Sequence, residues 1–287
     1  MAGSTSLLTL PVPVIDHVVV NVRDRMAVAA ADYARLGFAL TPQGRHTLGS
    51  INHLAMFGAD YLELLGLPPG EGDRMEVLAW PEGLTGIAFA TEDADAVHAA
   101  LHDAGAPVLP PLDFSRPVPL PGADGPAAFR VVRLAHGACP AGRVFFCQHR
   151  TRALVWRDPW RRHPNGALGI AGVVIAAHRP EALGELFRTL FGAAAVVPIA
   201  SGLRLAAGLA AIDVVAPEEA ARRYGPAAPP CDGREAVMAA LVLRTAAAAT
   251  TAAALRDGGV AHEAAGVGRI VVPAAASFGV ALEFRED

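Results

Sequence analysis

A single pattern occurs four times along this chain, and it constrains the fold more than any other feature of the sequence. Each copy starts with a β-branched or apolar strand, continues with a helix that ends near a glycine, and closes with three strand candidates. The copies start near Val14, Leu84, Leu168 and Val237, a spacing too wide for a solenoid. The pattern predicts an α+β fold built from four βαβββ modules.

The modules are expected to pair two by two. One face of a βαβββ sheet is covered by its helix, so the other face must be buried by a partner or must line a cavity. Two modules side by side form a curved mixed sheet around a hollow, where a ligand would bind. The predicted organisation is a tail (1–13), a first domain (14–150), a linker (151–167) and a second, degenerate domain (168–287).

Two proline-rich segments interrupt the pattern. The linker contains Pro159 and Pro164 and shows no apolar periodicity. The stretch from Pro107 to Pro126 is dense in proline and glycine and longer than most connections. We interpret it as a lid or specificity loop, or as a simple insertion.

The chain contains no lysine, which narrows its chemistry. Schiff-base lysines, pyridoxal phosphate enzymes and P-loop lysines are excluded. Its 10 histidines and 28 carboxylates are the remaining acid–base and ligand groups. The three cysteines are widely spaced and odd in number, and so they predict no disulfide framework.

Charge and hydropathy indicate a cytoplasmic protein. The net charge is -4, so no global field attracts nucleic acid or an anionic membrane. The most apolar window, 236–255, is interrupted by Arg244 and falls short of a membrane span, and the N-terminus lacks signal-peptide features. We expect a small-molecule substrate, with no nucleic-acid or membrane partner; a homodimer is compatible with these features.

His17 and Glu63 are predicted to face one hollow. In a strand, alternation turns the valines beside His17 toward the helix and His17 toward the hollow. The same rule buries Leu62 and Leu64 and turns Glu63 inward. A carboxylate flanked by leucines is costly unless a metal, an arginine or a ligand compensates it. On neighbouring strands the two residues would form an N,O ligand pair; a histidine–glutamate hydrogen bond is the alternative.

Four further polar residues of the first module are candidates. Arg45 and His46 precede its third strand and are predicted to bind a substrate carboxylate or phosphate. Asn52 and His53 alternate on that strand, so one of them faces the hollow, Asn52 to bind substrate or His53 as a ligand or general base. A solvated turn and a hydrogen-bonded sheet histidine are the structural alternatives.

Several strings resemble the vicinal oxygen chelate superfamily. IDHVVVNV at 15–22, GRHTLGSINHLAMFGADYLELL at 44–65, FFCQHRT at 145–151 and HPNGA at 163–167 are similar to its glyoxalase-like branch, most strongly over residues 14–176. The resemblance implies two curved mixed sheets of the vicinal-oxygen-chelate type. The superfamily includes isomerases, lyases, dioxygenases and metal-free antibiotic-binding proteins.

The resemblance also implies a ligand set. His17 stands at the first-strand ligand position and Glu63 at the fourth-strand position. In the second module the first-strand position is Gly86, which has no ligand atom. On its fourth strand either Cys147 and His149 or Gln148 face the hollow. With His149 inward, His17, Glu63 and His149 form a two-histidine, one-carboxylate set suited to a divalent Zn, Mn or Fe ion.

Three functions are consistent with this reading. The first is a glyoxalase-like metal-dependent lyase or isomerase that chelates vicinal oxygens of a small substrate, with Glu63 as a ligand and proton shuttle and His53 or His46 in proton transfer. The second is a non-catalytic small-molecule binding or resistance protein of the same fold, which Gly86 favours. The third is an Fe(II)-dependent dioxygenase.

Overall fold

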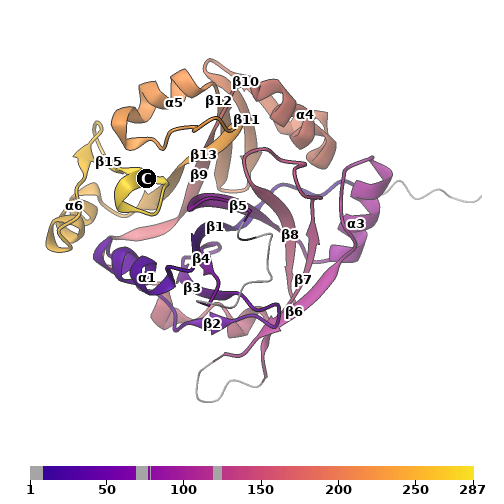
Figure 1. Cartoon of the computed structure of the whole chain (residues 1–287), viewed down its shortest axis with the longest axis horizontal. Helices are drawn as coiled ribbons and strands as arrows, with labels where there is room; N and C mark the ends of the chain where they lie inside the picture. The colour runs from indigo at the N-terminus through magenta and orange to yellow at the C-terminus, as the bar shows by residue number, and fades with distance from the viewer. Residues whose placement is uncertain (1–8, 69–76, 78, 119–124) are drawn as a thin grey trace, which may run out of the picture.

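The computed structural model describes residues 9–68, 77, 79–118 and 125–287, and it confirms the α+β architecture of two sheets from four modules. Figure 1 shows the two halves side by side, with the first curving around a central space. Within the described residues, none of the helices has the length and apolar character needed to cross a membrane.

The first sheet has eight strands in the order β2-β3-β4-β1-β5-β8-β7-β6, and helices α1 (Met26–Arg35) and α3 (Ala94–Asp103) belong to it. Its strands are β1 (Ile15–Arg23), β2 (Gly44–Arg45), β3 (Ile51–Met56), β4 (Tyr61–Gly66), β5 (Gly83–Ala90), β6 (Leu112–Arg116), β7 (Ala127–Arg133) and β8 (Arg143–His149). The first strands of the two modules, β1 and β5, pair antiparallel at the centre, and each pairs parallel with the last strand of its own module.

The second sheet repeats this order as β10-β11-β12-β9-β13-β16-β15-β14. Its strands are β9 (Ala167–Ala177), β10 (Val196–Ile199), β11 (Gly202–Ala207), β12 (Ala210–Val215), β13 (Ala236–Thr245), β14 (Glu263–Ala264), β15 (Arg269–Val272) and β16 (Ala281–Glu286). Its module helices are α4 (Pro180–Phe191) and α6 (Ala248–Asp257), and a further helix, α5 (Pro217–Tyr224), joins its two modules.

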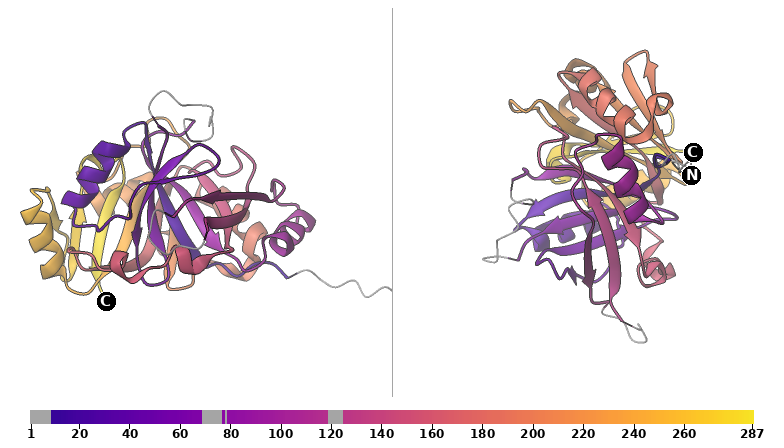
Figure 2. Two further views of the ribbon diagram at one scale, coloured as in Figure 1. Left: turned by 90° about the horizontal axis from the view of Figure 1, so that it is seen from below. Right: turned by 90° about the vertical axis from the view of Figure 1, so that its right-hand side faces the viewer.

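One hydrophobic core connects the two halves. It combines the helix-facing residues of both sheets, such as Val18 and Val20 from β1 with Val173 and Ile175 from β9. Helices α1 and α6 come from opposite halves and lie side by side (Figures 1 and 2). The aromatic ring of Phe38 stacks on that of Phe284 with centroids 6.1 Å apart, so the halves interdigitate.

The HPNGA segment fastens the linker to the first half. The buried His163 ring accepts a hydrogen bond from Ala39 N at Nδ1 (3.0 Å) and donates one from Nε2 to Met56 O (2.8 Å). Asn165 donates to Leu36 O at 2.9 Å. Short 3-10 turns at Arg152–Leu154 and Asp158–Trp160 occupy the rest of the linker. These contacts make His163 and Asn165 structural residues.

The proline-rich segment from 107 to 126 is not a plain loop. Strand β6 lies within it and forms the edge of the first sheet, paired antiparallel with β7. Residues 119–124 lie outside the described residues. Proline and glycine flank β6 closely, which conceals the strand signal in the sequence.

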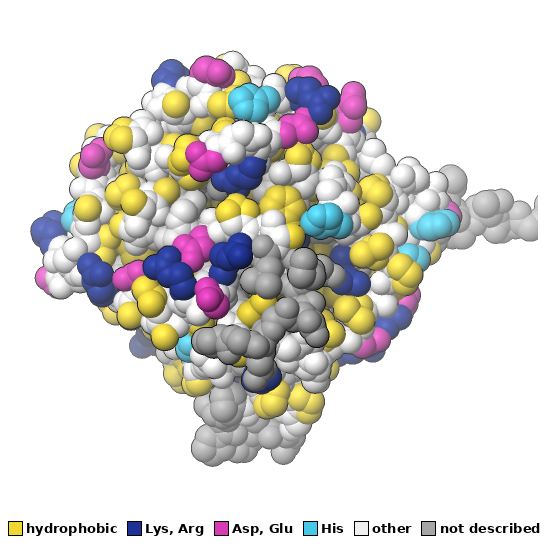
Figure 3. Space-filling model, viewed as in Figure 1, with side chains coloured by type: hydrophobic (Ala, Val, Ile, Leu, Met, Phe, Trp, Pro, Cys, Tyr) yellow, Lys and Arg dark blue, Asp and Glu magenta, His cyan; other side chains and the backbone are white. Residues whose placement is uncertain are grey.

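Opposite charges lie next to one another on the surface. On the face shown in Figure 3, arginines and carboxylates are intermixed over the described residues. One example is Arg25, whose Nη1 lies 2.8 Å from Glu82 Oε2. Such exposed pairs contribute little to stability, and the core dominates.

Candidate active site

The first sheet surrounds a cavity of about 140 Å³ on its concave face. Aromatic side chains that line it are Tyr61, Trp80, Phe114, Phe129 and Phe145. Its polar lining includes the side chains of His17, His46, Asn52, Glu63, Arg116 and Arg143. A mostly apolar hollow with a few converging polar groups is the usual form of a small-molecule site.

His17 and Glu63 meet in this cavity, as alternation predicts. Leu62 and Leu64 lie in the helix-side core, and Glu63 lies on the opposite face beside β1. His17 Nε2 lies 3.7 Å from Glu63 Oε2, and both side chains are at least nine-tenths buried. The His17 ring stacks on Tyr61 with centroids 4.4 Å apart, which holds the ring in this orientation.

Asp16 reaches the same site through a β-bulge. The pairing of β1 with β5 shifts register between Ile15 and His17, so Asp16 is the extra residue. Ile15 and Val18 both face the core, and strict alternation fails between them. Strict alternation would place Asp16 with Val18 on the helix side. Asp16 instead accepts hydrogen bonds from His17 Nδ1 at 2.6 Å and from His149 Nε2 at 3.0 Å.

The Asp16 carboxylate determines which nitrogen of each histidine carries a proton. Burial alone would raise the pKa of Asp16, but the hydrogen bonds from His149 and His17 lower it well below its ordinary range. An ionised carboxylate only accepts hydrogen bonds, so the two nitrogens that face it are protonated. In the neutral ring of His17 the lone pair therefore lies on Nε2, the nitrogen that faces Glu63.

Glu63 is held in its charged form by polar neighbours. Asn52 Nδ2 donates to Glu63 Oε1 at 2.7 Å, and His46 Nε2 lies 3.9 Å from the same oxygen. Burial raises the pKa of Glu63, but the nearby His46 and His17 and the bond from Asn52 outweigh it, and the net shift is downward. The carboxylate is thus ready to bind a cation at its second oxygen.

The remaining candidates of the first module divide between the cavity and the outside. His46 and Asn52 line the cavity, and His46 Nδ1 contacts Ser50 Oγ at 2.8 Å. Arg45 is exposed on β2, outside the cavity lining. His53 lies on the opposite face of β3, with Nδ1 2.7 Å from Thr41 O. Asn52, and not His53, is therefore the residue of β3 that faces the cavity, and the predicted catalytic role of His53 gains no support.

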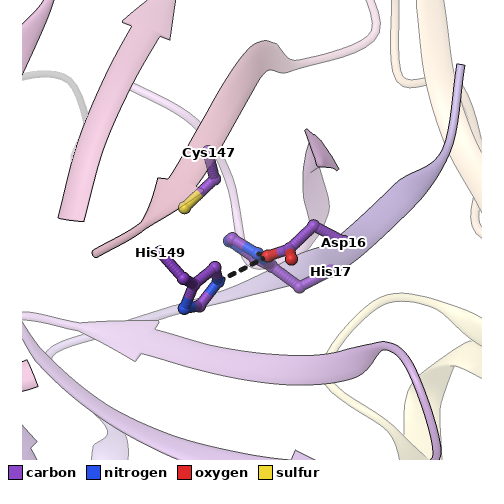
Figure 4. Close-up of side chains that lie close together, drawn as sticks. All are labelled: Asp16, His17, Cys147 and His149. Atoms are coloured by element: carbon purple, nitrogen blue, oxygen red, sulfur yellow. Dashed lines mark hydrogen bonds and ion pairs between the residues drawn. The ribbon is translucent and has the colours of Figure 1, made fainter. Parts of the chain in front are cut away.

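On β8, Cys147 and His149 face inward together. Figure 4 shows both side chains converging on Asp16 and His17. The residue of β5 between His17 and Phe145 is Ala88, whose small side chain lets side chains of β1 and β8 approach each other. One ligand atom from each of Asp16, His17, Cys147 and His149 lies within 4.8 Å of the others.

His149 faces Asp16 and not Glu63, so the predicted set of His17, Glu63 and His149 is not gathered around one point. Its Nδ1 atom is buried without a hydrogen-bond partner among the described residues, as is Nε1 of Trp156. The two rings lie 4.9 Å apart. Buried polar atoms without partners are rare and indicate an absent water, ion or ligand.

Two positions for a divalent ion therefore share His17. Bonds of about 2.0–2.2 Å allow one ion to span two ligand atoms up to about 4.2–4.4 Å apart. The separation of 3.7 Å between His17 Nε2 and Glu63 Oε2 satisfies that limit, and this position opens into the cavity. The second position, among Asp16, His17, Cys147 and His149, is enclosed by four ligands, as structural zinc sites are.

The second module adds no ligand atom at the positions that mirror His17 and Glu63. Gly86 mirrors His17, and a Cβ there would lie 3.0 Å from Cβ of Val19, so a larger side chain would crowd β1. Phe145, two residues before Cys147 on β8, mirrors Glu63 across the β1–β5 pair. The proposed ligand pair therefore comes from the first module alone, and the second module has a glycine and a phenylalanine at the equivalent positions.

The concave face of the second sheet is filled by α5 and the turn after it. Tyr224 and Ala220 pack against Val174 and Val215, and the Tyr224 hydroxyl donates to Glu283 at 2.9 Å. Asp213 and Glu283 point inward but are bound by arginines. This segment was not anticipated from the sequence, and its side chains occupy the space that corresponds to the cavity of the first sheet.

The profile of the glyoxalase-like domain matches residues 15–191, more than half of the chain. The chain belongs to the glyoxalase-like domain family. The match covers the whole first sheet, the HPNGA linker and the start of the second half. The cavity with His17 and Glu63 thus lies within the glyoxalase-like part. A comparison with curated proteins produced no match.

Solved structures with this fold confirm the vicinal oxygen chelate architecture. A hypothetical protein from Staphylococcus aureus aligns over 95% of this chain and 99% of its own, with a TM-score of 0.64 and 13% identity. A mutant of 4-hydroxymandelate synthase from Streptomyces coelicolor aligns over 96% and 93%, with a TM-score of 0.58 and 13% identity.

A fusion of a xylose isomerase-like TIM barrel with 4-hydroxyphenylpyruvate dioxygenase aligns over 97% of this chain, with a TM-score of 0.60 and 14% identity. The chain spans 50% of the length of that fusion protein. At these identities the similarity shows the fold.

Proposed function

We propose that this glyoxalase-like chain is a metal-dependent enzyme that acts on a small oxygenated substrate in the cavity of its first sheet. The main observation behind this proposal is that His17 Nε2 and Glu63 Oε2 face each other, buried and 3.7 Å apart. Because Asp16 holds one proton of His17 on Nδ1, the neutral ring and the Glu63 carboxylate both present lone pairs to a metal ion. Two such atoms are stable in a buried site when a cation lies between them.

A divalent Zn, Mn or Fe ion fits this donor set, with His17 and Glu63 as its protein ligands. The bound ion would supply Lewis acidity that polarises substrate oxygens and stabilises negative charge on them. Asp16 would act behind His17 by fixing its tautomer and raising the basicity of Nε2.

The other residues would bind the substrate and move its protons. His46 lines the cavity 3.9 Å from Glu63, which places an imidazole where a substrate proton can be taken or returned. Asn52 keeps Glu63 in position. Proton transfer beside a Lewis acid suits lyase or isomerase chemistry, which is the reaction type we favour.

A metal-free binding protein is the second candidate. Gly86 and Phe145 occupy the mirror positions of the two proposed ligands, so the second module supplies no metal ligand at either position. Tight ligand binding that survives chelation would support this candidate. An Fe(II) dioxygenase is a third candidate and predicts oxygen uptake with a catechol-like substrate.

Metal stoichiometry tests the proposal. Protein purified without chelator and then equilibrated with Mn, Zn or Fe is expected to hold one ion per chain by elemental analysis. Glu63→Gln should lose the ion, while Cys147→Ser should keep it, because Cys147 belongs to the enclosed position. Loss in Cys147→Ser with retention in Glu63→Gln would place the ion among the four-residue cluster. A wild-type chain that binds none of the three ions would refute metal dependence.

A further inference from the structure

Arg116, at the end of β6, is a buried guanidinium that faces the same cavity. The residue is 4% exposed. Across the described part of the chain, no carboxylate lies within 4.0 Å of its nitrogens and no hydrogen bond satisfies them. Other arginines of this sheet differ; Arg130, on the neighbouring strand, is bound by Asp95 and Asp113. A buried charge without a partner is costly and calls for a counter-ion.

The described lining of the cavity offers Arg116 no carboxylate of its own. Glu63 is the single carboxylate in that described lining, and it is already bound by Asn52 and faces His17. An anionic ligand in the cavity would therefore neutralise the charge of Arg116.

The side chain of Arg116 packs against Gly44. A Cβ on Gly44 would lie 3.2 Å from both Cδ and Nη1 of Arg116 and 2.4 Å from Oδ1 of Asn52. A side chain at position 44 would therefore displace the guanidinium from this wall. Gly44 pairs with Asn52, so the arginine lies over the strand pair that also positions Glu63.

The rest of strand β6 supplies a surface for a flat ring. Leu112, Phe114 and Arg116 alternate on one face and all line the cavity, so two apolar side chains precede the cation. Phe114 stacks on Phe129 with centroids 5.0 Å apart. The volume of about 140 Å³ is close to the roughly 150 Å³ of a cavity that holds benzene.

We propose that the cavity binds a small aromatic carboxylate, with its carboxylate on Arg116 and its ring against Phe114 and Phe129. The fork of a guanidinium matches the two oxygens of a carboxylate. A dianion such as a phosphate monoester is disfavoured because Glu63 lines the same cavity. The inference rests on the proposed function in taking this cavity as the substrate site, and it names the substrate class.

Calorimetric titration with benzoate and its neutral isostere benzamide tests this. Both are titrated into chelator-treated and Mn-loaded wild type, Arg116→Met, and the control Arg130→Met, whose arginine is ion-paired outside the cavity. Benzoate is expected to bind about ten- to hundredfold more tightly than benzamide in both wild-type forms. Arg116→Met should abolish this preference and leave benzamide affinity within about twofold, and Arg130→Met should preserve the preference.

Equal affinity for the two probes, no binding of either, or a preference that survives Arg116→Met would overturn the proposal. Tighter binding of phenyl phosphate than of benzoate would overturn the assignment to a carboxylate. If Arg116→Met does not fold, Arg116→Gln replaces it and should likewise lose the preference for benzoate over benzamide. The preference in chelator-treated protein depends on Arg116 alone, whereas metal stoichiometry depends on His17 and Glu63, so the two proposals fail separately.

Discussion

Asp213 occupies in the second sheet the strand position that Glu63 occupies in the first. Asp213 lies opposite Val174 of the neighbouring parallel strand, as Glu63 lies opposite Val19. The surroundings of the two carboxylates differ, because two arginines bind Asp213 while Glu63 faces His17 on the neighbouring strand. Arginines thus neutralise the carboxylate of the second half, whereas the equivalent carboxylate of the first half stays available to a cation.

This equivalence makes Asp213→Asn a matched control for Glu63→Gln. Asp213→Asn should leave metal stoichiometry unchanged and lower the free energy of unfolding by about 1–3 kcal/mol, because two partly exposed arginines lose their partner. Elemental analysis and urea unfolding measure the two effects. A loss of metal in Asp213→Asn would mean that the ion lies in the second half.

Asp16→Asn should weaken metal binding without removing the ligands. An asparagine lacks the negative charge of the carboxylate that both histidines bond, so it holds the His17 proton on Nδ1 less firmly and His17 Nε2 loses part of its basicity. The expected loss of affinity is about 10–100-fold, measured by competition with a chromogenic chelator. Asp60→Asn serves as the control, since Asp60 lies in the turn before β4 and bonds Ile170 N. Equal affinities in wild type and Asp16→Asn would contradict the placement of the ion at His17 Nε2.

The Asp60 side chain should make stability depend on pH. Burial raises the pKa of Asp60 to about 6 from 3.8 in the unfolded chain, against the bond from Ile170. Its stabilising contribution is therefore complete below pH 3.8 and is lost as pH rises through about 6. Asp60→Asn, which does not titrate, should match wild type near pH 4 and exceed it by up to about 3 kcal/mol near pH 8.

Urea unfolding of both proteins across this range measures the difference. A difference that does not change with pH would mean that folding leaves the pKa of Asp60 unshifted.

Phe284 belongs to the second half, but Phe284→Ala should also destabilise the first half. Phe284 is fully buried against Phe38, and its removal is expected to cost about 3–5 kcal/mol. All three tryptophans lie between residues 80 and 160, so their fluorescence reports on the first half alone. If the two halves share one core, the unfolding transition of Phe284→Ala seen by this fluorescence moves to a lower urea concentration. The fully exposed Val267→Ala is the control, and an unmoved transition in Phe284→Ala would show that the halves unfold independently.

Much of the fold could be predicted because its signals are local. The four repeats, the helices that end near glycines, and the alternation that turns His17 and Glu63 inward all depend on neighbours within a few residues. The helix α5 and the strand β6 were missed, since α5 is short and polar and β6 lies among prolines. The choice between Asn52 and His53 also stayed open, because alternation fixes two faces without saying which one is buried by helices.

The sequence by itself determined the modules, the inward-facing His17 and Glu63, and a chemistry without lysine. Tertiary structure alone decided that a bulge brings Asp16 behind His17, that β5 brings His149 across to it, and that β6 carries Arg116 into the cavity. Those contacts join residues up to 133 positions apart. The physical reason is that a strand's period sets which way a side chain points, whereas bulges and strand order set what it meets.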